Sequence, residues 1–196
     1  MDNTPLTGSP LTRAVLDIDE YLAGLGWDRP AQLFALVDTE QLRANEPELA
    51  ERLGVAEPDG ADAPEAADAL TPVEQDELPP DVPLDEFLAT IAWPDAVAGC
   101  ALAVERLMLP PSAEAAMPEA LRDDLRAGGG DAAATLQRWV ADHPERQEVR
   151  MTVAVLRDGR RESAIRLREK DDTTEVLTGP DLVPGLSQAL AATFED

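Results

Sequence analysis

The segment from Glu148 to Arg168 constrains the fold most, because apolar and polar residues alternate on both sides of Asp158-Gly159. Such alternation is typical of two half-buried β-strands, and Asp-Gly is typical of a hairpin turn. A two-residue turn would place arginines on the apolar face, because a shift of one residue exchanges the two faces. A three-residue loop with Gly159 at positive φ pairs Met151 with Ile165 and keeps one face apolar. The sequence therefore predicts an antiparallel hairpin with this second register.

Three arginines, Arg150, Arg166 and Arg168, fall on the other face of this hairpin. In the predicted register Arg150 lies opposite Arg166, and Glu148 lies opposite Arg168. Like charges that face each other are destabilising unless an anion lies between them. Residues 146–170 also hold eight of the sixteen basic residues and only four acidic ones, in a chain with a net charge of -24. The three arginines are therefore the candidate binding surface.

The sequence leaves open what neutralises these arginines. Their side chains can extend into water, the chain's own acidic segment can fold over them, or an external acidic partner or phosphate ligand can bind them. His143 and Cys100 are interpreted as residues with structural roles. His143 stands where a helix is expected to end and is interpreted as a C-terminal cap, and Cys100 is interpreted as a small buried apolar residue.

Periodicity elsewhere predicts an α+β fold. Residues 9–25 carry apolar residues at helical spacing between the N-cap Ser9 and Gly26, and a last helix is expected at 181–194. Short apolar runs predict further strands at 32–37, 97–109 and near 175–177. We expect two layers: a mainly antiparallel sheet of about four to five strands, with the N-terminal and C-terminal helices packed on it.

Composition divides the chain into three kinds of segment. Residues 1–8 are predicted to be a flexible tail, and residues 9–54 and 84–196 a single α+β domain. Residues 55–83 are predicted to be a disordered acidic linker rich in Ala and Pro, because residues 55–86 hold eleven carboxylates and no Lys or Arg. Within the linker, Thr71-Pro72-Val73-Glu74 matches a helix-capping pattern, so one helical turn is expected there.

Several functional classes are not expected. One cysteine and one histidine cannot supply the ligands of a zinc site, and nothing in the sequence marks a catalytic residue, a cofactor site or a metal site. The net charge of -24 repels nucleic acid and anionic lipid. The sequence also contains no apolar run long enough to span a bilayer and no signal-peptide pattern, so a cytoplasmic location without membrane insertion is expected.

Three stretches, residues 90–106, 147–168 and 177–194, together with residues 9–37, resemble an uncharacterised family of small acidic actinobacterial proteins. The resemblance covers most of the chain outside the predicted linker. It implies no substrate, cofactor or catalytic residue, because that family has no assigned activity.

The leading functional hypothesis is a non-enzymatic binding or adaptor protein for a protein partner, whose identity and oligomeric state the sequence does not indicate. The alternative is an enzyme or binding protein for an anionic small molecule held by Arg150, Arg166 and Arg168. A concave pocket that contains these arginines would favour the alternative, and a flat or covered sheet would favour the adaptor.

Overall fold

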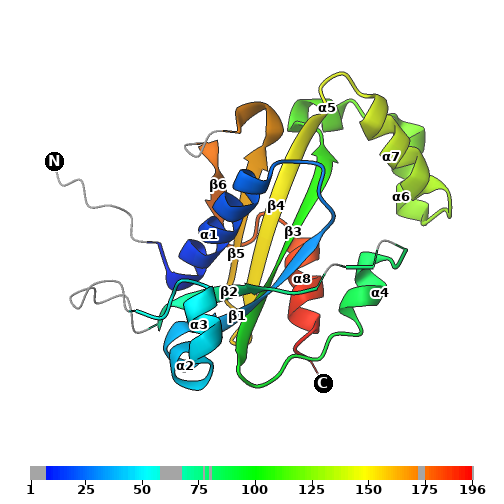
Figure 1. The fold of residues 1–196 in the computed structure, drawn as a ribbon. Coiled ribbons are helices and arrows are strands. Elements are labelled where there is room, and N and C mark those ends of the chain that lie inside the picture. Colours follow the sequence, from blue (N-terminus) through cyan, green and yellow to red (C-terminus); the bar gives the residue numbers. More distant parts are fainter. Residues whose placement is uncertain (1–7, 58–67, 77, 80, 172–174, 196) are drawn as a thin grey trace.

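The computed structural model describes residues 8–57, 68–76, 78–79, 81–171 and 175–195. Its centre is one open antiparallel sheet in the order β2-β1-β3-β4-β5-β6 (Figure 1). The strands are β1 (Gln32–Asp38), β2 (Leu70–Glu74), β3 (Val97–Met108), β4 (Gln147–Leu156), β5 (Arg161–Leu167) and β6 (Leu177–Gly179). The predicted α+β class is confirmed, with six strands instead of the four to five expected.

Eight α-helices lie in the described residues. They are α1 (Pro10–Leu25), α2 (Thr39–Asn45), α3 (Pro47–Arg52), α4 (Leu84–Leu88), α5 (Pro111–Ala115), α6 (Glu119–Ala127), α7 (Ala132–Asp142) and α8 (Pro184–Ala192), and a 3₁₀ turn, η2, covers Arg168–Lys170. Among these described helices, none combines the length and the apolar character that a membrane crossing requires.

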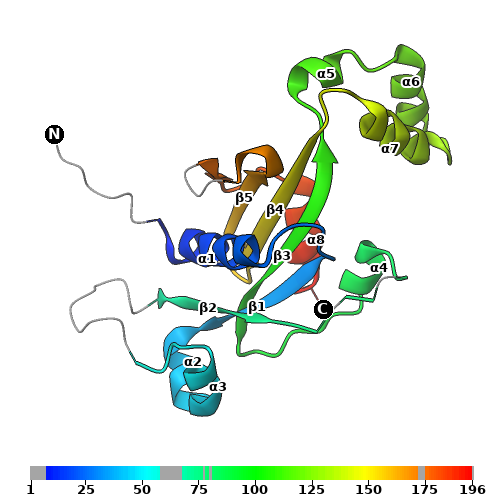
Figure 2. The same ribbon diagram turned by 45° about the horizontal axis from the view of Figure 1, so that its top comes forward.

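The sheet has a core on each of its two faces. Apolar residues of α1 pack with Phe34, Ala101 and Ala154 on one face. Leu190 of α8 and Leu88 of α4 pack with the alternate strand residues on the other face. The expected two-layer arrangement is therefore not confirmed, because the N-terminal and C-terminal helices cover opposite faces of the sheet (Figure 2).

Helix α1 follows its predicted sequence signals. The Ser9 hydroxyl accepts a hydrogen bond from the backbone N–H of Thr12 at 3.1 Å, and Pro10 occupies the first helical position. Gly26 ends the helix at a φ of +88°. The face that carries Val15, Ile18 and Leu22 is almost completely buried against the sheet.

The hairpin of β4 and β5 has the predicted register, with Met151 opposite Ile165 and Val149 opposite Leu167. Leu156 N–H donates to the carbonyl of Arg160, which closes the three-residue loop 157–159. Gly159 within that loop has a φ of +88°, as expected.

The predicted linker, residues 55–83, contains one strand of the sheet. Residues 70–74 form β2 and pair with β1 at the edge of the sheet, where the helical turn expected at Thr71 is replaced by extended chain. The Thr71 side chain is buried, and its hydroxyl lies 2.8 Å from that of Thr39. Residues 58–67 of the linker, like residues 1–7 of the predicted tail, lie outside the described residues.

The connection between β3 and β4 forms a small helical lobe. Its helices α5, α6 and α7 lie beyond the ends of the two strands, apart from α8 and α4 (Figures 1 and 2). Few lobe side chains are fully buried; these are Leu109, Ala113, Leu121 and Ala132. The lobe therefore keeps much of its apolar surface outside the main core.

Candidate functional site

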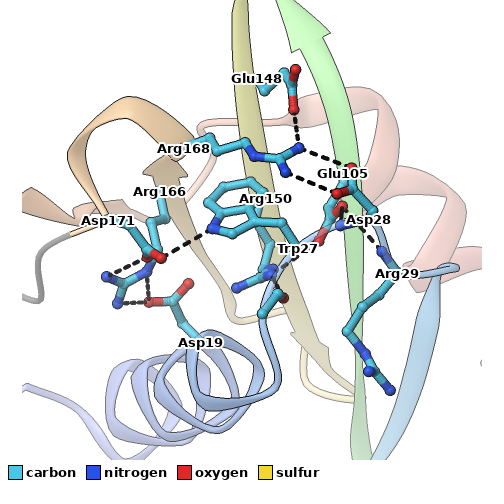
Figure 3. Close-up of polar contacts among 11 residues, drawn as sticks. Asp19, Trp27, Asp28, Arg29, Glu105, Glu148, Arg150, Arg166, Arg168 and Asp171 are labelled. Carbon is cyan, nitrogen blue, oxygen red and sulfur yellow. Dashed lines mark hydrogen bonds and ion pairs between the residues drawn. The ribbon is translucent and has the colours of Figure 1, made fainter.

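Two of the three predicted site residues are buried. Arg150 and Arg166 lie opposite each other on β4 and β5, as the register predicted, but each side chain is only 2% exposed. Helix α1 and the segment that follows it cover this face of the sheet (Figure 3). The expectation of an outward arginine face is therefore wrong for Arg150 and Arg166, and the cause is the position of α1.

Arg166 forms a buried ion pair with Asp19 of α1. Its Nε lies 2.9 Å from Oδ2 of Asp19, and its Nη2 donates to the same oxygen. Its Nη1 lies 3.7 Å from Oδ1 of Asp171. Burial opposes the charged guanidinium, but the hydrogen bond and charge of Asp19 and the charge of Asp171 outweigh it, so the pKa of Arg166 is raised.

Arg150 links β4 to the connection between α1 and β1. Its Nη2 lies 2.9 Å from Oε1 of Glu105 on β3 and also donates to the carbonyl of Gly26. The other oxygen of Glu105 accepts hydrogen bonds from the backbone N–H groups of Asp28 at 2.8 Å and Arg29 at 3.2 Å. One carboxylate on the sheet therefore positions both the guanidinium and the connecting loop.

Arg168 is the most accessible of the three, with 37% of its side chain exposed. It donates two hydrogen bonds of 2.8 Å to the Asp28 carboxylate and one to Glu148. The bond from Arg168 holds the pKa of Asp28 below its usual value and, with the bond to Glu148, raises the pKa of Arg168. The Trp27 ring lies 4.5 Å from the Arg150 guanidinium and 5.6 Å from that of Arg168, and its Nε1 donates to Asp171 (Figure 3).

The repulsion predicted between these arginines is thus relieved inside the molecule. Five carboxylates contact the three guanidiniums; they belong to Asp19, Asp28, Glu105, Glu148 and Asp171. None of these five comes from residues 55–83. An anionic ligand would have to displace carboxylates that already hold the arginines at hydrogen-bond distance.

The structure places Cys100 and His143, the two other residues considered from the sequence, in the surroundings of structural residues. The Cys100 side chain is fully buried on β3, and burial raises the pKa of its thiol to about 12. His143 follows α7, where its backbone N–H donates to the carbonyl of Val140 and its Nδ1 accepts a hydrogen bond from the N–H of Glu145 at 3.1 Å.

A groove that the sequence did not reveal lies between the end of β3 and α7. It consists of two adjoining hollows of about 820 Å³ and about 660 Å³ that share Leu107, Leu136 and Val140. The larger hollow is lined by Leu107, Met108, Leu109, Pro111, Glu114, Ala115, Met117, Arg122, Leu125, Arg126, Leu136, Trp139 and Val140. The smaller is lined by Trp27, Asp28, Glu105, Arg106, Leu107, Leu136, Gln137, Val140 and Glu148. We call this surface the β3–α7 groove.

The sequence contained one signal of the groove. Leu136, Trp139 and Val140 stand at helical spacing, which is typical of one apolar face of a helix. In the structure this face lines the groove and remains partly exposed, as do Leu107 and Met108 at 39% and 37%. Periodicity shows that a face is apolar, but it does not show whether the protein covers that face.

The β3–α7 groove adjoins the accessible part of the predicted arginine surface. Glu148 lines the smaller hollow of the groove, and it also lines a separate hollow of about 420 Å³ with Arg146 and Arg168. Arg168 therefore lies beside the groove, whereas Arg150 and Arg166 lie beneath α1.

Comparison with known proteins identifies the family of the chain. No match was found among curated proteins, and none among solved structures. The profile of the family described as PPA1309-like protein, a family without an assigned activity, matches residues 11–195. The match extends from α1 to the end of α8 and includes the whole sheet and the lobe. The chain therefore belongs to the family of PPA1309-like proteins.

Proposed function

We propose that this protein is a non-enzymatic binding protein for a protein partner, and that the partner binds in the β3–α7 groove. The observation that carries the proposal is the contiguous, partly exposed apolar surface of this groove. Leu107 and Met108 on β3 lie beside Trp139 and Val140 on α7. Monomeric proteins rarely expose large contiguous apolar surfaces unless these contact another molecule.

The composition of the groove is that of a protein interface. The larger hollow is lined mainly by apolar residues, including two methionines and a tryptophan, together with Glu114, Arg122 and Arg126, and the smaller hollow adds further charged residues. Aromatic residues, Met and Arg are enriched at the centres of protein interfaces, and polar residues surround them. Arg168 beside the groove is the part of the predicted arginine surface that a partner can still reach.

The alternative function, a site for an anionic small molecule on the sheet arginines, has less support. Arg150 and Arg166 are buried, and their guanidiniums contact carboxylates of the same chain. The proposal also places the protein in the cytoplasm, in keeping with a chain whose only cysteine is a free, buried thiol.

Two matched leucine substitutions test the binding function. Leu107→Arg adds a charge inside the groove, whereas Leu177→Arg adds the same charge on β6 at the far side of the sheet, where Leu177 is 59% exposed. The proteins recovered from the native cell with the wild-type chain are quantified against those recovered with each variant, after thermal melts establish that both variants fold. We expect the specific partner to be lost with Leu107→Arg and kept with Leu177→Arg. Equal recovery with both variants would contradict a partner site in the groove.

A further inference from the structure

One side of β3 has no neighbouring strand along its last residues. β1 pairs with β3 from Val97 to Ala103, and Pro30, two residues before the first paired residue Gln32, has no backbone N–H with which to continue the ladder. β3 itself continues to Met108 and over this length pairs with β4 alone. Within the described residues, the groove side of β3 beyond Val104 is therefore an open sheet edge.

The hydrogen-bond pattern shows which backbone groups point to this open edge. The N–H of Arg157 donates to the carbonyl of Ala98, so the even-numbered residues of β3 direct their backbone groups toward β4. The odd-numbered residues direct theirs to the other side, where β1 pairs with Gly99, Ala101 and Ala103. Continuation of this alternation turns the N–H and C=O groups of Glu105 and Leu107 toward the groove. There the Glu105 carbonyl accepts a hydrogen bond of 2.9 Å from Nη1 of Arg106, an exposed contact that an added strand would replace.

The shape of the groove agrees with this direction. Successive side chains of a strand point to opposite faces of the sheet. The smaller hollow nevertheless contacts Glu105, Arg106 and Leu107, and the larger one contacts Leu107, Met108 and Leu109. A hollow that contacts consecutive residues lies against the edge of the strand, so the groove runs along the open edge, with α7 as its opposite wall.

We propose that the partner binds by strand addition, as an extended segment that pairs with β3 at Glu105 and Leu107 and lies between β3 and α7. This inference rests on the proposed binding function and specifies its geometry. The backbone groups of the open edge supply hydrogen bonds, while Leu136 and Val140 of α7 contact alternate apolar side chains of the segment.

Charge indicates that the added segment is basic. The smaller hollow is lined by three carboxylates, those of Asp28, Glu105 and Glu148, and by one arginine, Arg106. Asp28 and Glu148 share the guanidinium of Arg168, and Glu105 pairs with Arg150, so the excess negative charge belongs to the chain as a whole. The net charge of -24 attracts a cationic segment and repels a second copy of this chain. The expected occupant is a segment of another protein in which apolar residues alternate with Lys or Arg.

Amide hydrogen exchange and peptide binding test this geometry. The probes are a short capped peptide of alternating Val and Arg, the same peptide N-methylated at alternate residues, its Val and Glu counterpart, and a helix-forming peptide of matched charge. In the free protein, the amide of Leu107 is expected to exchange faster than those of Arg106 and Met108, which pair with β4. The Val and Arg peptide should protect the Leu107 amide, and N-methylation should weaken its binding about tenfold or more.

A pair of protein variants supplies the matching control. Leu107→Pro removes the edge N–H, a change that an edge strand tolerates, whereas Leu107→Ala removes the side chain and keeps the N–H. We expect Leu107→Pro to weaken peptide binding more than Leu107→Ala does. The N-methylated peptide makes the same comparison on the wild-type chain, so the test stands if Leu107→Pro fails to fold.

Three results would overturn strand addition: no binding of the Val and Arg peptide, binding that N-methylation leaves unchanged, or preferential binding of the acidic or helical peptide. None of these three results contradicts the proposed function, which the Leu107→Arg and Leu177→Arg variants test separately. If Leu107→Arg still abolishes partner recovery while Leu177→Arg does not, the groove binds its partner in another conformation.

Discussion

Asp19 in α1 and Arg166 in β5 form a buried ion pair between residues 147 positions apart in the chain. The two side chains are 1% and 2% exposed. The pair joins the first helix to the C-terminal half of the sheet. It also gives Arg166 a carboxylate partner that offsets the like charge of Arg150, which lies opposite Arg166 on β4. The same contact explains why the arginine face predicted from the sequence is covered.

Loss of Asp19 should be strongly destabilising. Asp19→Ala leaves the Arg166 charge buried without its main partner, and removal of one member of a buried pair costs about 3–5 kcal/mol of unfolding free energy. Replacing both residues, as Asp19→Leu with Arg166→Met, should recover most of that loss because no charge is then left unpaired. Urea denaturation measures both effects. A loss below about 1 kcal/mol for Asp19→Ala would show that the pair does not hold α1 on the sheet.

The hairpin loop should depend on Gly159, whose φ of +88° is unfavourable for residues with a Cβ atom. Gly159→Val should lower the unfolding free energy by roughly 1–2 kcal/mol, and Gly159→Asn by less, because Asn tolerates positive φ better. Gly130→Val is the control, since this glycine has open space around it and no positive φ. Equal losses at Gly159 and Gly130 in chemical denaturation would contradict backbone strain as the cause.

The Cys100 thiol should be unreactive in the folded protein and should make stability depend on alkaline pH. Its pKa is raised from 9.0 to about 12 by burial, so the folded state retains a proton that the unfolded state loses first. The contribution of Cys100 is therefore complete below pH 9 and is lost as pH rises toward 12. Cys100→Ala should remove this part of the pH dependence in denaturation experiments. Rapid alkylation of the native thiol near neutral pH would contradict the raised pKa.

The sequence predicted the parts of the fold that depend on neighbouring residues. The alternation around Gly159 determined the hairpin register, and Ser9, Pro10 and Gly26 marked both ends of α1. Strand β2 was missed because its acidic surroundings resemble a disordered segment and Pro72 resembles a helix start. Its position at the edge of the sheet, where Pro is tolerated, depends on pairing with β1, which local sequence does not show.

The surroundings of the candidate site residues depend on packing between segments that are distant in the chain. The sequence placed Arg150 opposite Arg166 but could not show that α1 would bring Asp19 over them. The helical spacing of Leu136, Trp139 and Val140 likewise does not show that this face of α7 borders an open strand edge. Both relationships join segments distant in the chain, so they follow from the assembled fold.

The most direct measurement of the central claim, that the β3–α7 groove binds a protein partner, is site-specific photocrosslinking in the native cell. A photoreactive benzoylphenylalanine replaces Val140 in the groove or, as the control, Leu177 on β6. We predict that illumination joins the chain to a distinct partner from position 140 but not from position 177, and that Leu107→Arg in the same chain abolishes the adduct. The same adduct from both positions, or an adduct from position 140 that persists with Leu107→Arg, would contradict the claim.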